Sequence, residues 1–437
     1  MADVQPFPGL RYNLERIGDL SAVISPPYDV ISPEEQQLYY RRSPYNVIRL
    51  EHGEERPGDS PQDNKYLRAA ATLREWLEEG ILVKEERPAF YLVQHSFPFQ
   101  DTLRTRWGLM ARVRLEELGS GSIRPHEMTM REPARDRLAL LRACQANFSP
   151  VMGLFRHRRR ELPRLFAPAI AQPPSMSATD SYGVTYSIRL VSDEDTVARV
   201  RRFFAAKTIY IADGHHRYET ALAYSKEQSA RRSPAAGEGS NFILMNLADA
   251  ADPDLVMLST HRLVRGIEAD RMAHLEAEFE ACFHLELLPP RETLAETLTN
   301  WFDALQGQRG VAFGLYGLHK GHLCLLAARD QRTLSEMMPP IWPELLRSLD
   351  VSILHWVVLR GMLGIDSVEK QERCLDYTRD GLEALARVDS GEYQLAFFLN
   401  RCSIASILAV ADAGFRVPQK STYFYPKTPT GLVINPL

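Results

Sequence analysis

The sequence runs Thr208-Ile209-Tyr210-Ile211-Ala212-Asp213-Gly214-His215-His216-Arg217-Tyr218-Glu219-Thr220-Ala221-Leu222 near the middle of a chain of 437 residues. The beginning of this stretch is β-branched and aromatic, which favours a strand. Asp213-Gly214 is a turn signal, and the residues that follow it suit a helix with regularly spaced apolar side chains. The stretch therefore predicts a strand, a tight turn and the N-terminus of a helix.

The turn at Gly214 has the chemistry of an anion site. The first amides of a helix point beyond its N-terminus, where the helix dipole also favours negative charge. Gly214 has no side chain, so a ligand can approach the backbone closely. Arg217 offers a planar fork that can hold two phosphate oxygens, and His215 and His216 can add donors. We therefore predict that Asp213 and the four residues after it form a phosphate-binding turn.

Two other interpretations of the turn remain open. In the first, Asp213 only caps the helix and its polar neighbours are solvated. In the second, His215 and Glu219 bind a metal, because residues four apart share one helix face. No third ligand follows at helical spacing, although metal sites in proteins usually need one.

Two stretches in the N-terminal third carry further titratable groups. The first, Pro26-Pro27-Tyr28-Asp29, predicts a rigid loop that presents a phenol and a carboxylate. The second, Arg124-Pro125-His126-Glu127-Met128-Thr129, follows a glycine-serine loop and combines groups suited to acid–base chemistry. An ordinary structural turn and a capped helix start are the alternative interpretations of these two stretches.

A third stretch lies near the C-terminus and reads Gln419-Lys420-Ser421-Thr422-Tyr423-Phe424-Tyr425-Pro426-Lys427. Lys420 and the hydroxyls of Ser421 and Thr422 are suited to contact a phosphate, whereas the aromatic residues suit packing. We interpret His261 and His355 as structural. The basic residues 156–160 are interpreted as a solvated helix start or linker, and residues 233–240 as a mobile loop.

The composition excludes several classes of protein. An apolar fraction of 45% and a charged fraction of 25% exclude disorder as the main state. No apolar run reaches the roughly 18 residues that span a bilayer, and the first residues lack the pattern of a secretory signal. A net charge of -4 gives no general attraction to nucleic acid. The five cysteines form no C-x-x-C pair, so we expect no zinc knuckle or disulfide framework. These observations predict a cytoplasmic protein without a membrane or nucleic-acid partner.

Local patterns predict the remaining elements. Ser32-Pro33-Glu34-Glu35 indicates a helix start, and residues 46–50 a strand. An amphipathic helix is expected at 64–80 and a hairpin from strands at 90–95 and 107–115. Later helices are expected at 267–283, 291–306, 342–363 and 404–411, and strands at 311–316, 322–327 and 393–399. We infer an α+β (mixed α/β) fold with an N-terminal α/β region at 1–165, a region at 175–265 that carries the phosphate-binding turn, and a C-terminal α/β region at 266–437, which are able to interdigitate.

These motifs together resemble a widespread prokaryotic family of unknown function. Residues 26–32, 124–129, 212–222 and 419–427 carry the resemblance, which extends over nearly the whole chain. A shorter resemblance is more informative, because Asp213-Gly214-His215-His216-Arg217 is similar to the phosphate-binding signature of the ParB/sulfiredoxin superfamily. It implies a ParB/sulfiredoxin-like phosphate-binding core with additional α/β elements. Position 215 is histidine, not the active-site cysteine of sulfiredoxins, which argues against sulfinate repair.

Within that superfamily the sequence resembles the free-serine kinases best. The resemblance implies a phosphotransferase that uses ATP or ADP and Mg²⁺ to phosphorylate a small hydroxyl substrate, with free L-serine as the leading expectation. The alternatives are a nucleotide-hydrolysing switch of the ParB type and a phosphate-ester hydrolase such as a phosphoserine phosphatase.

Each candidate residue has a role in this hypothesis. The nucleotide phosphates would be held by Asp213, Gly214, His215, His216, Arg217, Lys420, Ser421 and Thr422. Asp213 would bind Mg²⁺ or orient the arginine. Glu127 and Asp29 are the candidate catalytic bases, and His216 is a further catalytic candidate. The substrate would be bound by Tyr28, His126 and Arg124.

Overall fold

The computed structural model describes residues 1–437 apart from 120, 130, 158–160, 232–238, 290–292 and 309, and leaves undescribed the side chains of 131–134, 231 and 294. The described residues form two compact units. Unit 1 comprises Met1–Pro125, Thr129–Val256 and Phe424–Leu437, and unit 2 comprises His126–Met128 and Met257–Tyr423. The chain therefore enters unit 2 briefly at His126–Met128, then leaves unit 1 again after Val256 and returns to it at Phe424.

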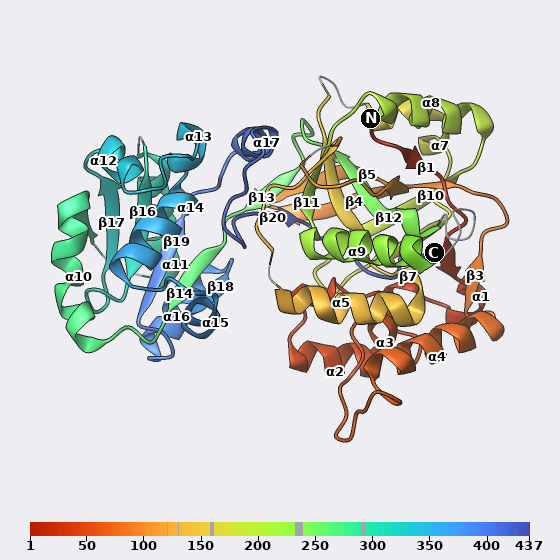
Figure 1. Cartoon of the computed structure of the whole chain (residues 1–437), viewed down its shortest axis with the longest axis horizontal. Helices are drawn as coiled ribbons and strands as arrows, with labels where there is room; N and C mark the ends of the chain where they lie inside the picture. Colours follow the sequence, from red (N-terminus) through yellow and green to blue (C-terminus); the bar gives the residue numbers. More distant parts are fainter. Residues whose placement is uncertain (120, 130, 158–160, 232–238, 290–292, 309) are drawn as a thin grey trace. The chain divides into compact units, whose positions relative to one another are not determined.

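A mixed sheet forms the centre of unit 1 (Figure 1). Its strands lie in the order β6-β11-β8-β12-β5-β4-β10-β9, and β1 pairs with β5. They are β1 (Val4–Gln5), β4 (Phe90–Phe99), β5 (Thr102–Arg114), β6 (Ile123–Arg124), β8 (Val151–Phe155), β9 (Met176–Thr179), β10 (Thr185–Val191), β11 (Ile209–Asp213) and β12 (Phe242–Asp249). β8 and β12 are buried along their whole length, as expected for central strands that are apolar throughout. The regions 1–165 and 175–265, which we distinguished on sequence, both supply strands to this sheet.

Helices cover the sheet of unit 1. Figure 1 shows α9 and α5 side by side, and α5 contacts α4. The bounds are α1 (Leu14–Ile17), α2 (Pro33–Arg42), α3 (Ile48–Glu51), α4 (Lys65–Glu78), α5 (Arg131–Cys144), α6 (Leu162–Leu165), α7 (Ala167–Ile170), α8 (Glu194–Ala205) and α9 (His215–Arg231). The short strands are β2 (Leu10–Tyr12), β3 (Leu82–Lys84), β7 (Ala146–Asn147) and β21 (Asn435–Pro436). The capping box predicted at Ser32 and Glu35 is present at the start of α2.

Unit 2 is built on a second sheet, in the order β15-β17-β16-β19-β14-β18. Its strands are β14 (His261–Val264), β15 (Phe283–Leu288), β16 (Ala312–Tyr316), β17 (Leu323–Ala328), β18 (Leu375–Thr378) and β19 (Leu395–Leu399). Its helices include α10 (Ala269–Cys282), α11 (Leu294–Gln306), α12 (Gln331–Glu336), α15 (Val368–Cys374), α16 (Gly381–Asp389) and α17 (Ile404–Asp412). The chain crosses between units within β13 (Val256–Leu258) and β20 (Tyr423–Tyr425). The expected mixture of helices and strands is confirmed in both units.

The strand predicted at residues 46–50 is wrong. These residues lead into helix α3, because the side chain of Asn46 organises the local backbone. Its Oδ1 accepts a hydrogen bond from the Ile48 amide at 3.0 Å, and its Nδ2 donates to the carbonyls of Ala22 and Ile24 at 2.9 and 3.1 Å. A side chain that satisfies a first-turn amide starts a helix, and this contact overrides the β propensity of Val47 and Ile48.

The single helix predicted at 342–363 is also wrong. The segment contains α13 (Glu344–Arg347), α14 (Asp350–Ile353) and the π-helix η4 (Leu354–Met362). Leu349 has extended backbone, which separates α13 from α14. Residues 158–160 of the basic cluster and 233–238 of the expected loop lie outside the described residues. Within the described chain, every helix is too short or too polar to cross a bilayer.

Candidate phosphate-binding site

The turn at Gly214 joins a buried strand to a long helix. β11 ends at Asp213, Gly214 has a φ of 85°, and α9 runs for 17 residues from His215. The Tyr218 amide donates to the Gly214 carbonyl at 3.0 Å, which closes the first turn. A Cβ at position 214 would lie 2.8 Å from Arg217 Nε, at a φ that favours glycine. The predicted strand, turn and helix are confirmed, and the turn requires glycine.

Two cationic side chains converge on the carboxylate of Asp213. Arg217 Nη2 donates to Asp213 Oδ2 at 2.7 Å, and Lys427 Nζ donates to Asp213 Oδ1. The side chains of Arg217 and Lys427 are only 9% and 10% exposed. Asp213 therefore orients both cations beside the N-terminus of α9.

The guanidinium of Arg217 is also fixed from its other side. Nη1 donates to the carbonyl of Pro150 at 2.6 Å. Arg217 thus uses two of its five N–H donors in bonds to described residues, one from each Nη atom. Burial lowers the pKa of Arg217, but Asp213 and then Asp29 outweigh that effect, so the pKa is raised. The arginine is held as a cation by the protein, and a ligand would meet a guanidinium already fixed in direction.

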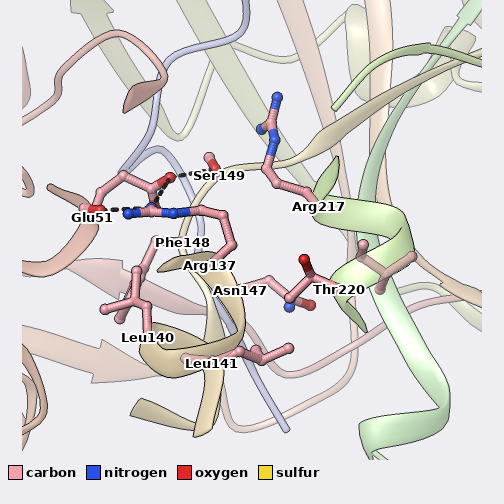
Figure 2. Close-up of a pocket in the computed structure, with 11 residues that line it drawn as sticks. Glu51, Arg137, Leu140, Leu141, Asn147, Phe148, Ser149, Arg217 and Thr220 are labelled. Carbon is pink, nitrogen blue, oxygen red and sulfur yellow. Dashed lines mark hydrogen bonds and ion pairs between the residues drawn. The ribbon is translucent and has the colours of Figure 1, made fainter. Parts of the chain in front are cut away.

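A small cavity of about 50 Å³ lies beside Arg217 (Figure 2). Figure 2 shows the Glu51–Arg137 pair on one side of this cavity and Arg217 pointing away from the pair. Ser149 Oγ donates to Glu51 Oε1 at 2.8 Å, and Arg137 Nη1 lies 3.4 Å from the same oxygen. Burial raises the pKa of Glu51, although Arg137 opposes the shift. The cavity is thus bordered by a buried arginine, a partly buried arginine and a buried carboxyl group.

The proline-rich loop at Tyr28 is attached to this charged cluster. Tyr28 lies in the short 3-10 helix η2 (Tyr28–Val30), and the Arg137 guanidinium lies 4.0 Å from the centre of its ring. Burial raises the pKa of the Tyr28 phenol. Asp29 is exposed, and it makes no hydrogen bond or ion pair with any residue that the structure describes. The loop therefore presents Asp29 to solvent and buries part of Tyr28.

A second group of the predicted residues lies in unit 2. His126 Nε2 is 2.9 Å from Thr422 Oγ1, and Thr422 Oγ1 donates to Glu127 Oε2 at 3.5 Å. Ser421 Oγ donates to the Pro418 carbonyl. Lys420 is exposed and has a φ of 56°. The structure thus gathers His126, Glu127 and Thr422, and it directs the Ser421 hydroxyl to the backbone.

The other predicted residues are readily placed. Arg124 lies on β6 opposite Tyr210 of the parallel strand β11, so both strands end at one edge of the sheet. His215 is buried and His216 partly exposed at the start of α9. His261 accepts from the Leu399 amide at 3.4 Å, and burial lowers its pKa to about 4. Burial also lowers the pKa of His355 to about 4. Burial thus favours the neutral form of both His261 and His355, and their structural role stays a prediction.

Sequence reasoning missed Lys427, Glu51 and Arg137. Lys427 lies within a stretch that we quoted, but the local pattern favoured Lys420. The partner of Lys427 is 214 residues away along the chain, so no spacing rule relates the two. Glu51 directly follows the segment that we predicted as a strand, and Arg137 lies in α5 without a distinctive motif, so only the fold brings the two together.

The sequence model of one protein family matches most of the chain. The model for "Protein of unknown function (DUF1015)" matches residues 4–352. The chain belongs to the DUF1015 family. This confirms the expected membership in a family of unknown function, and no curated protein matches this DUF1015 member.

Several solved structures show a remote likeness to this DUF1015 chain. A conserved hypothetical protein from Pyrococcus furiosus is 13% identical, with 71% of this chain and 90% of that chain covered and a TM-score of 0.35. A free serine kinase in complex with AMP is 13% identical, with 71% and 92% covered and a TM-score of 0.34. SbnI with C-terminal truncation from Staphylococcus aureus is 11% identical, with 74% and 85% covered and a TM-score of 0.36. At these values the likeness carries no conclusion about activity.

Proposed function

We propose that this DUF1015 protein binds the phosphates of ATP or ADP at the N-terminus of α9 and transfers a phosphoryl group to the hydroxyl of a small molecule. Free L-serine is the first acceptor to test. The observation that carries the proposal is the convergence of Arg217 and Lys427 on Asp213 beside Gly214. The similarity of residues 213–217 to the ParB/sulfiredoxin signature supports a phosphate as the ligand.

The charges at the turn suit a dianionic group. Arg217 and Lys427 carry two positive charges, and Asp213 neutralises one of them. The amides at the start of α9 point beyond the helix, and its dipole adds to the positive potential. A phosphate would therefore receive donors from the backbone and from two fixed cations. Positioning and charge neutralisation are the main requirements of phosphoryl transfer.

Lys427 takes the role that the sequence analysis gave to Lys420. Lys427 reaches the phosphate-binding turn within unit 1, whereas the Lys420 backbone carbonyl accepts from Arg262 at 3.2 Å in unit 2. An ammonium group has three N–H donors, so Lys427 can take a phosphate oxygen as a further partner without leaving Asp213. We therefore assign charge neutralisation to Lys427.

Glu127 stays the proposed catalytic base. Its carboxylate accepts from the Thr422 hydroxyl, which the His126 ring also contacts, so it is held by neighbours suited to proton transfer. Asp29 is the second candidate, because its carboxylate is exposed. His126, Arg124 and Tyr28 stay proposed as substrate-binding residues, and His216 as a catalytic one.

In this arrangement Asp213 is not suited to be a direct ligand of Mg²⁺, because each of its carboxylate oxygens already accepts a hydrogen bond from a cationic side chain. Across the described residues, no group of three His, Cys, Asp or Glu side chains is arranged to hold a metal ion. Mg²⁺ bound to a nucleotide neutralises phosphate charge, and the roles given above do not depend on it. The geometry of Asp213 suits the orienting role instead.

Incubation of the purified protein with L-serine, Mg²⁺ and ATP or ADP tests the proposal. We expect one molecule of O-phosphoserine for each molecule of nucleotide consumed. Both quantities are measured by ³¹P NMR and mass spectrometry. Lys427→Met should abolish most of the product. Lys226→Met is the matched control, because Lys226 lies on α9 and bonds Glu117 at 2.6 Å, with 60% of its side chain exposed.

The same assay separates the alternatives. Slow nucleotide hydrolysis without an acceptor would favour the switch. Release of phosphate from phosphoserine without nucleotide would favour the hydrolase. If the protein consumes no nucleotide and forms no phosphorylated product with any of a series of small hydroxyl compounds, the transferase proposal is wrong.

A further inference from the structure

The segment that carries Lys427 lies against one face of the unit 1 sheet. We call residues 425–428 the C-terminal strap. Arg106 Nη1 donates to the Tyr425 carbonyl at 3.3 Å, and Nη2 donates to the Pro426 carbonyl at 2.8 Å. Both bonds fix the backbone immediately before Lys427. The strap is thus held from the sheet at the two residues that precede the cation.

Other strands hold the end of the strap. Asn246 Nδ2 donates to Thr428 Oγ1 at 2.7 Å, and His95 Nε2 lies 3.3 Å from the same hydroxyl. The Tyr186 hydroxyl donates to the Lys427 carbonyl at 3.2 Å. These bonds come from β4, β10 and β12, and they fix the backbone at and after Lys427.

The sheet is shaped to receive these side chains. His95 and Arg106 are direct cross-strand partners of β4 and β5. Gly108 lies two residues after Arg106, on the same face of β5. A Cβ at Gly108 would overlap the side-chain amide of Asn246. The glycine therefore leaves the space in which Asn246 reaches the strap.

Packing alone does not account for an arginine at position 106. Its side chain is fully buried, and it bonds no carboxylate within the described chain. Burial lowers its pKa to about 10. A buried cation without a carboxylate is unfavourable, and an apolar side chain of similar volume is commonly tolerated at such a position. The feature that only the guanidinium supplies is a pair of parallel donors for two successive carbonyls.

We propose that Arg106 is a positioning residue: through its bonds to the strap it fixes Lys427 on Asp213 and thereby sets the affinity of the turn for phosphate. The part that concerns affinity rests on the proposed function. Arg106 itself touches neither the carboxylate nor the ligand. Its effect is transmitted over two peptide groups of the strap.

The first test follows Lys427 without any ligand. Brief acetylation of the native full-length protein, read by peptide mass spectrometry, gives the labelling rate of each lysine. In Arg106→Met we expect Lys427 to react about tenfold faster, the result of a loss of about 1.4 kcal/mol in local stability. Lys65 is the internal reference, because its side chain is 14% exposed and bonds Asp136 at 2.8 Å in unit 1. A general loss of structure would accelerate both lysines, whereas loss of positioning accelerates Lys427 alone.

Matched variants make the result specific. Arg104→Met removes an arginine from the same face of β5, and Arg104 donates to the Pro253 carbonyl at 3.3 Å instead of the strap. We expect it to leave the Lys427 rate unchanged. Arg106→Lys keeps the charge but loses the planar fork that serves both carbonyls, so its labelling rate should lie between those of the wild type and Arg106→Met. Arg106→Lys also replaces Arg106→Met in both tests if Arg106→Met does not fold.

The second test measures ADP binding by calorimetry. We expect Arg106→Met to bind ADP about tenfold more weakly than the wild type, and Arg104→Met to bind it equally well. A wild-type labelling rate of Lys427 in folded Arg106 variants would overturn the proposal, and so would faster labelling with unchanged ADP affinity. If the wild type does not bind ADP, the proposed function fails, and the labelling rates alone decide whether Arg106 positions Lys427.

Discussion

Replacing Asp213 by Asn tests whether one carboxylate organises the phosphate-binding turn. The substitution keeps the shape of the side chain and removes the charge that faces Arg217 at 2.7 Å and Lys427 on the other oxygen. Both cations are largely buried, at 9% and 10% exposure. Breaking a buried pair by removing one partner costs about 3–5 kcal/mol. Because the amide oxygen of Asn still accepts one hydrogen bond, we expect a loss near the lower limit, about 3 kcal/mol.

The assay is hydrogen exchange of the amides in β11 and the first turns of α9, which reports the free energy of local opening. Lys427→Met combined with Asp213→Asn completes a double-mutant cycle. In the Asp213→Asn background, we expect Lys427→Met to cost little stability, because it then removes a cation that has already lost its carboxylate. A coupling energy of about 1–2 kcal/mol would follow. Strictly additive effects would refute the reasoning, since they would mean that Asp213 and Lys427 stabilise the turn independently.

Three further substitutions test other parts of the structure. Gly214→Ala should lower the stability of the turn by about 1–2 kcal/mol and weaken ADP binding, because φ is 85° and the new Cβ meets Arg217; equal exchange and affinity would contradict this. Ser149→Ala removes a buried hydrogen bond to Glu51 and should cost about 1.5–3 kcal/mol by urea unfolding, whereas a neutral effect would show that the bond is dispensable. Burial raises the pKa of Asp350 from 3.8 to about 7, so the folded state binds its proton more tightly than the unfolded state does. The stability of unit 2 should therefore fall as pH rises through this interval, and Asp350→Asn should reduce the slope; the same slope in the variant would disprove the assignment.

Local chemistry explains which parts of the fold were predictable. The β-branched run before Asp213, the glycine at 214 and the helix-forming residues after it all favour the same local structure, and the structure has it. The capping box at Ser32 and Glu35 is equally local. The segment 46–50 failed because Asn46 bonds two carbonyls more than 20 residues earlier, a contact that no window of neighbouring residues contains.

The candidate site was predictable only in part for the same reason. Asp213, Gly214 and Arg217 lie within one turn of chain, so their proximity follows from helix geometry. Lys427 reaches Asp213 only because the sheet holds the strap, and the pattern around Lys420 gave no reason to prefer the later lysine. Arg137 and Glu51 meet across 86 residues. Charged residues that meet only in the folded chain cannot be recognised as partners from their spacing in the sequence.

The return of the chain to unit 1 at Phe424 has a consequence for biosynthesis. Domains generally fold as units while the ribosome extends the chain, with N-terminal parts first. When Val256 emerges, every strand of the central sheet from β1 to β12 has already been made, yet the lysine that faces Asp213 has not. A nascent chain can therefore assemble this sheet before residues 257–423 of unit 2 exist, but it acquires the second cation of its anion site only after all of those residues have been synthesised.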